Sequence, residues 1–240
     1  MAETLLFGGS GRLGTELRQH LKDCVAPPRA EVDVTRPETI EAALAHHRPS
    51  VVVHAAGWVD VRGCETDRPR AWRMNVEGTQ NVVRALRDRP DTRLVYVSTA
   101  CVFRGDRGDY TEDDVPYPAN FYGVTKLVGE QLARTHPRTF IVRTDFVARK
   151  PWPYPGAFVD RYSTSVFAPE LAEKLGELVN RGSEGLLHLC GRDKVSHYDL
   201  ARIVSPDVKP ISLKDVDLPL PRDQSLRSTR GGDVLMLRRT

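Results

Sequence analysis

The sequence is poor in the features that mark several large protein classes. Its 240 residues include only four cysteines, Cys24, Cys64, Cys101 and Cys190, and these lie far apart with no metal-ligand spacing. The scatter argues against a disulfide-stapled fold and against a zinc finger. It indicates free thiols in a reducing compartment, so we expect a cytoplasmic protein that binds no metal.

Long apolar runs and an excess of one charge are also missing. The longest apolar stretches, such as residues 51–56, fall far short of a membrane span, and no secretion leader is visible before the first apolar run. Lysine and arginine number 35 against 32 aspartates and glutamates, so the formal net charge is only +3. We therefore expect neither a membrane nor a nucleic acid among the partners, and both a monomer and a homodimer are left open.

Apolar runs typical of strands alternate with segments of helical period, which is the pattern of parallel βαβ units. Strands are predicted at residues 4–7, 51–56, 94–97, 140–142 and 186–189. Helices are predicted at residues 13–21, 37–47, 68–86, 121–134 and 169–181, with one more short helix opened by Ser196. The alternation predicts an α/β fold with a Rossmann-type doubly wound parallel sheet.

A glycine-rich turn joins the first predicted strand to the first predicted helix. Gly8, Gly11 and Gly14 allow a tight turn, close approach of the backbone to a pyrophosphate and close helix–strand packing. The usual acidic residue about twenty positions further on is absent; Arg29 stands there, and Arg12 lies within the turn. Unless both arginines are only solvated surface residues, two cations without an acid favour the 2′-phosphate of NADP(H). NAD(H) is kept as the alternative cofactor.

Further cofactor contacts are predicted after the next strands. Asp33 and Val34 precede the second helix and would lie beside the adenine, whereas Ala55, Ala56 and Gly57 would let the backbone approach the cofactor ribose. The complete predicted cofactor site comprises Gly8, Ser10, Gly11, Arg12, Leu13, Arg29, Asp33, Val34, Ala55, Ala56, Gly57, Tyr122 and Lys126.

The character of the chain changes after about residue 148, because three prolines fall within residues 150–156. We expect a dinucleotide-binding domain of residues 1–149. Residues 150–240 are predicted to form a smaller substrate-binding lobe that is interleaved with the first domain and packs at the carboxyl ends of its strands.

Tyr122 and Lys126 have the spacing Tyr-x-x-x-Lys, which places both side chains on one face of a helix. Because a nearby ammonium favours the phenolate, Lys126 is predicted to lower the pKa of Tyr122. Ser98 and Thr99 end a central strand, where α/β sheets place their ligands. Together these groups predict carbonyl reduction beside a nicotinamide. Thr99 or Ser98 would orient the substrate oxygen, Tyr122 would transfer the proton, and Lys126 would hold the nicotinamide ribose.

These residues resemble the extended branch of the short-chain dehydrogenase/reductase superfamily and, more narrowly, the dTDP-4-dehydrorhamnose reductase family. The similarity is dense to about residue 146 and thin afterwards. The matching stretches are residues 6–14, 33–37, 48–56, 75–79, 96–99, 102–103, 110–112, 122–130, 142–144, 185–191, 221–222 and 225–226.

The resemblance implies that Thr99, Tyr122 and Lys126 are catalytic, that NADPH delivers the hydride, and that the substrate is the 4-keto group of a nucleotide-linked deoxysugar. It also implies that Arg222 lies near the nucleotide part of that substrate. The predicted substrate-binding residues are Ser98, Thr99, Cys101 and Arg222.

Two departures from the family pattern keep alternatives open. Ala100 and Cys101 stand where an aspartate and an aromatic residue are usual, and the chain is short around residues 150–165. The alternatives are a sugar-nucleotide epimerase or dehydratase that retains NAD, and a non-catalytic NADP-binding regulatory subunit.

Overall fold

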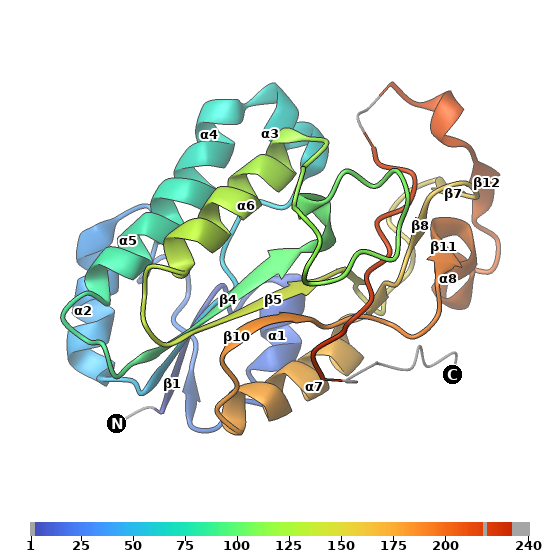
Figure 1. The fold of residues 1–240 in the computed structure, drawn as a ribbon. Helices are drawn as coiled ribbons and strands as arrows, with labels where there is room; N and C mark the ends of the chain where they lie inside the picture. Colours follow the sequence, from blue (N-terminus) through green and yellow to red (C-terminus); the bar gives the residue numbers. More distant parts are fainter. Residues whose placement is uncertain (1–2, 218–219, 232–240) are drawn as a thin grey trace.

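A parallel sheet of six strands forms the centre of the protein (Figure 1). The computed structural model describes residues 3–217 and 220–231. In spatial order the strands are β10 (Gly185–His188), β5 (Thr139–Thr144), β4 (Arg93–Thr99), β3 (Val51–His54), β1 (Thr4–Phe7) and β2 (Cys24–Val25). The chain thus winds outward from β1 in both directions, which confirms the predicted Rossmann-type sheet.

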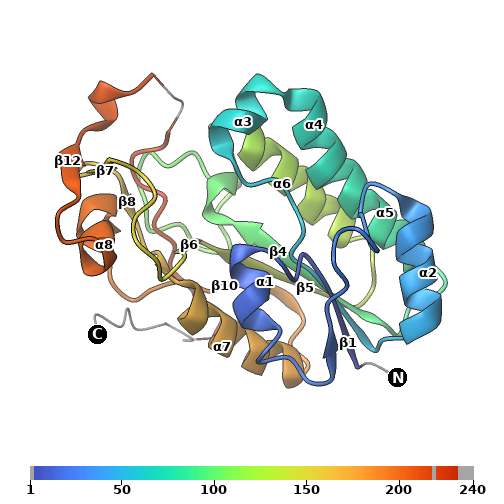
Figure 2. The ribbon, with the colours of Figure 1, turned by 180° about the vertical axis from the view of Figure 1, so that it is seen from behind.

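Helices cover both faces of this sheet (Figures 1 and 2). One face carries α1 (Arg12–Leu17) and α7 (Ala168–Asn180). The other face carries α2 (Pro37–His47), α5 (Gly78–Ala85) and α6 (Phe121–Ala133). The helices α3 (Val61–Thr66) and α4 (Arg68–Trp72) and the π-helix η1 (Arg73–Glu77) lead into α5.

The strands are apolar along almost their whole length because helices bury both faces of the sheet. In β4, Val95 and Val97 join the buried cluster under α1 and α7, whereas Leu94 and Tyr96 join the cluster under α2, α5 and α6. Since successive side chains of a strand point to opposite faces, both sets must be apolar when both faces are buried.

Two predicted helices differ from the structure. The helix expected at residues 13–21 ends at Leu17, because tighter bonds such as His20 N–H to the Leu17 carbonyl close the next turn, although Leu21 remains in the core. The helix expected at residues 68–86 is interrupted by the π-helical turn of η1. A π-turn inserts an extra residue and is frequent at functional sites.

The remaining elements form a second lobe at the carboxyl ends of the strands (Figure 1). They are η2 (Ala100–Val102), β6 (Phe146–Val147), β7 (Gly156–Phe158), β8 (Tyr162–Ser163), β9 (Val166–Phe167), β11 (Val195–Ser196), α8 (His197–Val204), β12 (Lys209–Ile211) and η3 (Leu213–Asp215). Ser196 caps α8 as predicted, accepting the Asp199 N–H at 3.0 Å. Because β10 belongs to the first sheet and α7 packs on one of its faces, residues 150–240 contribute to both units, and the division at residue 149 stays a prediction.

Candidate active site

The glycine-rich turn packs against the residues that follow β3. Gly8 has a φ of +90°, and a Cβ at Gly8 would lie 2.6 Å from the Ala56 nitrogen. A Cβ at Gly14 would lie 2.1 Å from the Gly8 carbonyl oxygen. The first N–H groups of α1 have no intrahelical acceptor. The predicted residues Gly8, Gly11, Ala55 and Ala56 therefore meet in a turn whose surface is backbone.

The other predicted residues of the turn differ in their exposure. Ser10 and Arg12 are exposed, whereas Leu13 is buried in the core cluster under α1. Val34 is also buried, with its Cγ2 atom 2.9 Å from where a Cβ at Gly78 would lie. Any cofactor contact of Leu13 or Val34 is therefore made by the backbone.

Arg29 has an acidic partner that the sequence argument overlooked. Its Nε lies 3.3 Å from Asp33 Oδ2, and Asp33 Oδ1 also accepts the Thr35 N–H at 2.9 Å. The pairing offsets part of the positive charge proposed for a 2′-phosphate. Arg12 is the other predicted cation, and it lies exposed beside the turn.

The close packing of the turn predicts a strong effect of Gly14→Ala. The new methyl group would collide with the Gly8 carbonyl, so we expect the free energy of unfolding to fall by about 1–3 kcal/mol and NADPH binding to weaken. Fluorescence titration with NADPH measures the second effect. Gly11→Ala is the matched control for the loss of stability alone, because its Cβ would lie 3.2 Å from the same oxygen and needs only a small shift. Unchanged NADPH affinity in Gly14→Ala would contradict the proposed role of the turn.

Tyr122 and Thr99 meet at the carboxyl end of β4. Tyr122 lies in the first turn of α6, whose N-cap Asn120 accepts the Gly123 N–H at 2.8 Å. The phenol is buried, and the Thr99 hydroxyl is near enough to act on it in the direction of a lower pKa. The Cys101 N–H donates to the same Thr99 oxygen at 3.1 Å. The structure thus brings together the predicted hydroxyl and the predicted proton donor.

Lys126 lies one turn further along α6. Its Nζ donates to the Val97 carbonyl at 2.9 Å and lies 4.1 Å from the centroid of the Tyr96 ring. Burial lowers the pKa of Lys126 to about 7, and the Glu130 carboxylate acts in the opposite direction. Burial raises the pKa of Tyr122 well above its usual value. The prediction that Lys126 lowers the pKa of Tyr122 is therefore wrong, because desolvation of the phenol dominates.

The Ser98 hydroxyl is bound by a residue of α6 other than Tyr122. Its Oγ donates to Glu130 Oε1 at 2.5 Å. Glu130 also accepts two hydrogen bonds from Arg143, at 2.9 and 2.8 Å, in an ion pair whose side chains are 0% and 2% exposed. The Ser98 hydroxyl is therefore engaged by Glu130, Thr99 is the strand-end hydroxyl that acts on the phenol, and the substrate-binding role of Ser98 stays a prediction.

Cys101 packs beside Tyr122, as its predicted place in the site requires. Burial raises the pKa of its thiol, and Sγ donates to Gln224 Oε1 at 3.5 Å. The neighbouring Ala100 is buried with Val102 and Phe103 in a small apolar cluster. Ala100, which stands where the family usually has an aspartate, is therefore a core residue in this chain.

Arg222 is exposed in the second lobe. Its carbonyl accepts the Tyr162 N–H at 2.7 Å, and its guanidinium acts electrostatically on the Asp160 carboxylate. No contact of Arg222 with Tyr122 or Thr99 is present among residues 3–217 and 220–231.

Two residues that shape the site were given no role in the sequence analysis. Asn75, in the π-turn η1, accepts the Trp58 N–H at 2.7 Å and donates to Thr125 Oγ1 at 3.0 Å, so it fixes the segment after β3 against α6. Gln224 donates to the carbonyls of Ala100 and Phe103 at 3.3 Å and so braces the turn after β4. No spacing rule marks either residue, because both bind groups that are distant in the sequence.

Several other observations bear on the class of site. Within the described ranges 3–217 and 220–231, no group of three or more histidine, cysteine, aspartate or glutamate side chains is arranged to hold a metal ion. No helix in those ranges has both the length and the apolar character that a membrane crossing requires. All four cysteines are free thiols.

Several known proteins are similar to this chain. The family model of the RmlD substrate binding domain matches residues 2–163. A protein of Streptomyces antibioticus named "Probable dTDP-4,6-dihydroxy-2-methyloxan-3-one 4-ketoreductase" is 32% identical over 246 residues, covering 91% of this chain and 83% of that protein. The dTDP-4-dehydrorhamnose reductase of Mycobacterium tuberculosis is 29% identical over 257 residues, covering 91% of this chain and 82% of the reductase.

A solved structure supports the fold. The dTDP-4-dehydrorhamnose reductase of Bacillus anthracis, in complex with NADP, aligns with a TM-score of 0.89 at 24% identity, covering 100% of this chain and 96% of that one. The match to the RmlD substrate binding domain spans more than half of the chain. The chain therefore belongs to this family, that of the dTDP-4-dehydrorhamnose reductases, within the extended short-chain dehydrogenase/reductase superfamily.

Proposed function

We propose that this protein is an NADP-dependent reductase of the 4-keto group of a nucleotide-linked deoxysugar. The relatives named as dTDP-sugar reductases support this substrate class. The observation that carries the proposal is the buried Tyr122 phenol next to the Thr99 hydroxyl, which ends strand β4 at the carboxyl edge of the sheet. This supports a proton donor and an orienting hydroxyl where an α/β sheet binds its ligands.

The glycine-rich turn fits the pyrophosphate of a dinucleotide. A Cβ at Gly8 or Gly14 would collide with backbone atoms, so the turn presents its N–H groups without side chains in the way. Arg12 is free to contact a 2′-phosphate, and Ala55 and Ala56 lie beside the turn. When bound, NADPH would supply a hydride to the carbonyl carbon.

Tyr122 supplies the proton that the carbonyl oxygen takes up. A tyrosine phenol is neutral at pH 7 at its ordinary pKa and stays so when burial raises that pKa, so Tyr122 holds a proton that it can donate. Thr99 holds the same oxygen next to the phenol. Lys126, fixed to the Val97 carbonyl, is placed to bind the nicotinamide ribose, and Cys101 lines the substrate side of the phenol.

One observation favours NAD(H) as the second candidate cofactor. Arg29 forms an ion pair with Asp33, so Arg12 is the remaining predicted cation for the 2′-phosphate that distinguishes NADP(H) from NAD(H). A protein that retains NAD through gel filtration would support the alternative of an epimerase or dehydratase.

Turnover tests the proposal directly. We expect the purified protein to oxidise NADPH when given a dTDP-linked 4-keto-6-deoxysugar, and to bind NADPH more tightly than NADH in fluorescence titrations. Tighter binding of NADH would overturn the cofactor assignment. NADPH binding without turnover on any nucleotide-linked 4-keto-sugar, together with co-purification of a larger enzyme, would instead support a regulatory subunit.

The cellular setting stays a prediction. The four free thiols support a reducing compartment, and we propose the cytoplasm. The proposed partner is the small-molecule sugar nucleotide, and the choice between a monomer and a homodimer stays open.

A further inference from the structure

Three buried polar atoms around the reactive centre have no hydrogen-bond partner within residues 3–217 and 220–231. They are Asn120 Nδ2, Thr144 Oγ1 and Arg161 Nε. Asn120 caps the helix that carries Tyr122, and Thr144 is the register partner of Thr99 on the neighbouring strand. A buried polar atom without a partner costs free energy that a ligand can recover.

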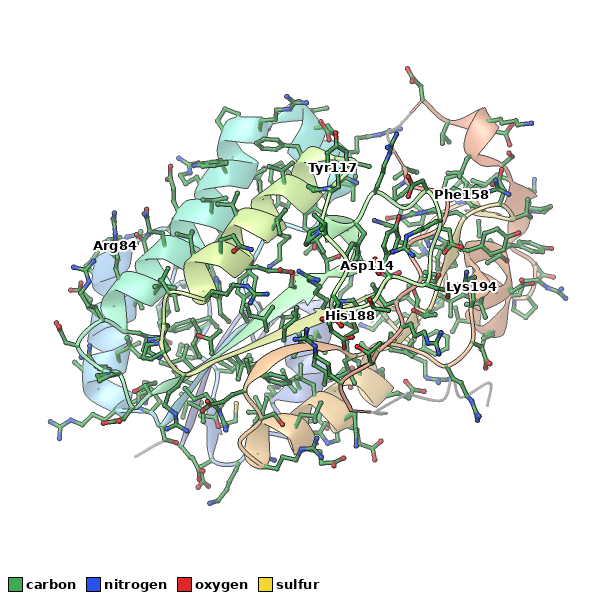
Figure 3. All side chains as sticks on the ribbon, viewed as in Figure 1. Arg84, Asp114, Tyr117, Phe158, His188 and Lys194 are labelled. Atoms are coloured by element: carbon green, nitrogen blue, oxygen red, sulfur yellow. The ribbon has the colours of Figure 1, made fainter. Side chains whose placement is uncertain are left out.

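A short series of contacts links the segment that contains Arg161 to Cys101, which packs beside Tyr122. The Cys101 thiol donates to Gln224 at 3.5 Å, and the Gln224 N–H donates to the carbonyl of Tyr162 at 3.1 Å. The Arg161 carbonyl accepts the His197 N–H at 2.9 Å. Consistent with this position, the guanidinium acts electrostatically on both the Cys101 thiol and the His197 imidazole. Phe158, whose ring centroid lies 6.4 Å from that of His197, marks this part of the lobe in Figure 3.

The positive charge of Arg161 has no counterion among the described residues. The carboxylate of Asp160 accepts hydrogen bonds from Ser212 Oγ at 2.6 Å and Leu213 N–H at 2.9 Å. Asp145 is held by Ser165 Oγ at 2.5 Å. Asp145 also acts electrostatically on the Cys101 thiol, but among the described residues Arg161 makes no direct ion pair with a carboxylate. A partly buried guanidinium without such a pair is suited to bind an anion, most strongly through two parallel N–H···O bonds.

We propose that Arg161 binds the diphosphate of the nucleotide-linked substrate and is a specificity-determining residue of the site. The inference rests on the proposed function, because the diphosphate is the anionic part of a sugar nucleotide. In a hexose the diphosphate on C1 lies across the ring from C4, so it lies one sugar ring away from the carbonyl that faces Tyr122. The Arg161 guanidinium acts on the Cys101 thiol, which packs beside the phenol, so Arg161 lies on the side of the site where the diphosphate would extend, whereas Arg222 is exposed.

Binding of dTDP, measured by calorimetry in the presence of saturating NADPH, tests the assignment without requiring turnover. We expect Arg161→Gln to weaken dTDP binding by about tenfold or more, since it removes a charge-assisted contact. Arg161→Lys keeps the charge without the paired donors and is expected to bind with intermediate affinity. Arg84→Gln is the matched control, because Figure 3 shows Arg84 on the helices at the end of the molecule away from Phe158.

The outcomes separate this inference from the proposed reaction. Wild-type affinity for dTDP in Arg161→Gln overturns the inference even if the enzyme reduces dTDP-sugars. Failure of the wild-type protein to bind dTDP overturns it as well. Loss of dTDP binding in Arg161→Gln, with NADPH affinity retained as evidence of folding, supports the inference even if no 4-keto-sugar is reduced.

Discussion

Tyr122→Phe is expected to lower kcat by roughly 100- to 10,000-fold, the range typical of losing a general acid. The substitution removes the phenolic proton and leaves the ring in its buried position beside Cys101. NADPH binding should stay near normal, because the glycine-rich turn is untouched. Steady-state NADPH oxidation and fluorescence titration measure the two effects.

A matched substitution checks that the loss is specific. Tyr117 is 67% exposed in the loop before α6, so Tyr117→Phe removes a hydroxyl of the same kind without reaching the site (Figure 3). It should turn over like the wild type. If Tyr122→Phe retained the wild-type rate on its substrate, another group would have to supply the proton, and the proposed mechanism would be wrong.

Glu130→Met is expected to lower the free energy of unfolding by about 3–5 kcal/mol, because it leaves the Arg143 guanidinium buried without its counterion. The pair is among the least exposed in the structure, with side chains 0% and 2% exposed. Ser98 would lose its acceptor at the same time. Urea denaturation followed by circular dichroism measures the change.

Two further variants give this stability prediction its control. The double variant Glu130→Met/Arg143→Met removes both charges and should recover much of the loss. Glu184→Gln breaks an ion pair with Arg138 whose side chains are 42% and 47% exposed, and it should cost only about 0.2–1 kcal/mol. If Glu130→Met and Glu184→Gln lowered the free energy of unfolding by equal amounts, burial would not explain the contribution of the Glu130–Arg143 pair to stability.

The main sheet could be predicted because its strands are buried on both faces. The apolar runs that become β1, β3, β4 and β5 stand out for this reason, and α2 begins and ends at the predicted residues. The break at η1 could not be predicted, because residues 73–77 keep an apolar spacing close to helical. The helix is interrupted there where Asn75 bonds to the segment after β3.

The sequence indicated which residues form the candidate site more readily than it indicated their pKa values. The spacing of Tyr122 and Lys126 places both on α6, but spacing does not report desolvation, which dominates the pKa of each. The choice between Ser98 and Thr99 depended on knowing which face of β4 each occupies. Glu130 lies four residues after Lys126 on the same helix, a signal that could have revealed the buried partner of Arg143.

The position of β10 has a consequence for how the two halves of the chain fold. This strand comes from the second half, yet it pairs with β5, and α7 completes the apolar cluster on one face of the sheet. A fragment that stopped at residue 149 would expose the backbone edge of β5 and a hydrophobic surface. Both features promote aggregation. We therefore expect the first half to need the second half to cover its sheet, and the two halves to unfold together as one cooperative unit.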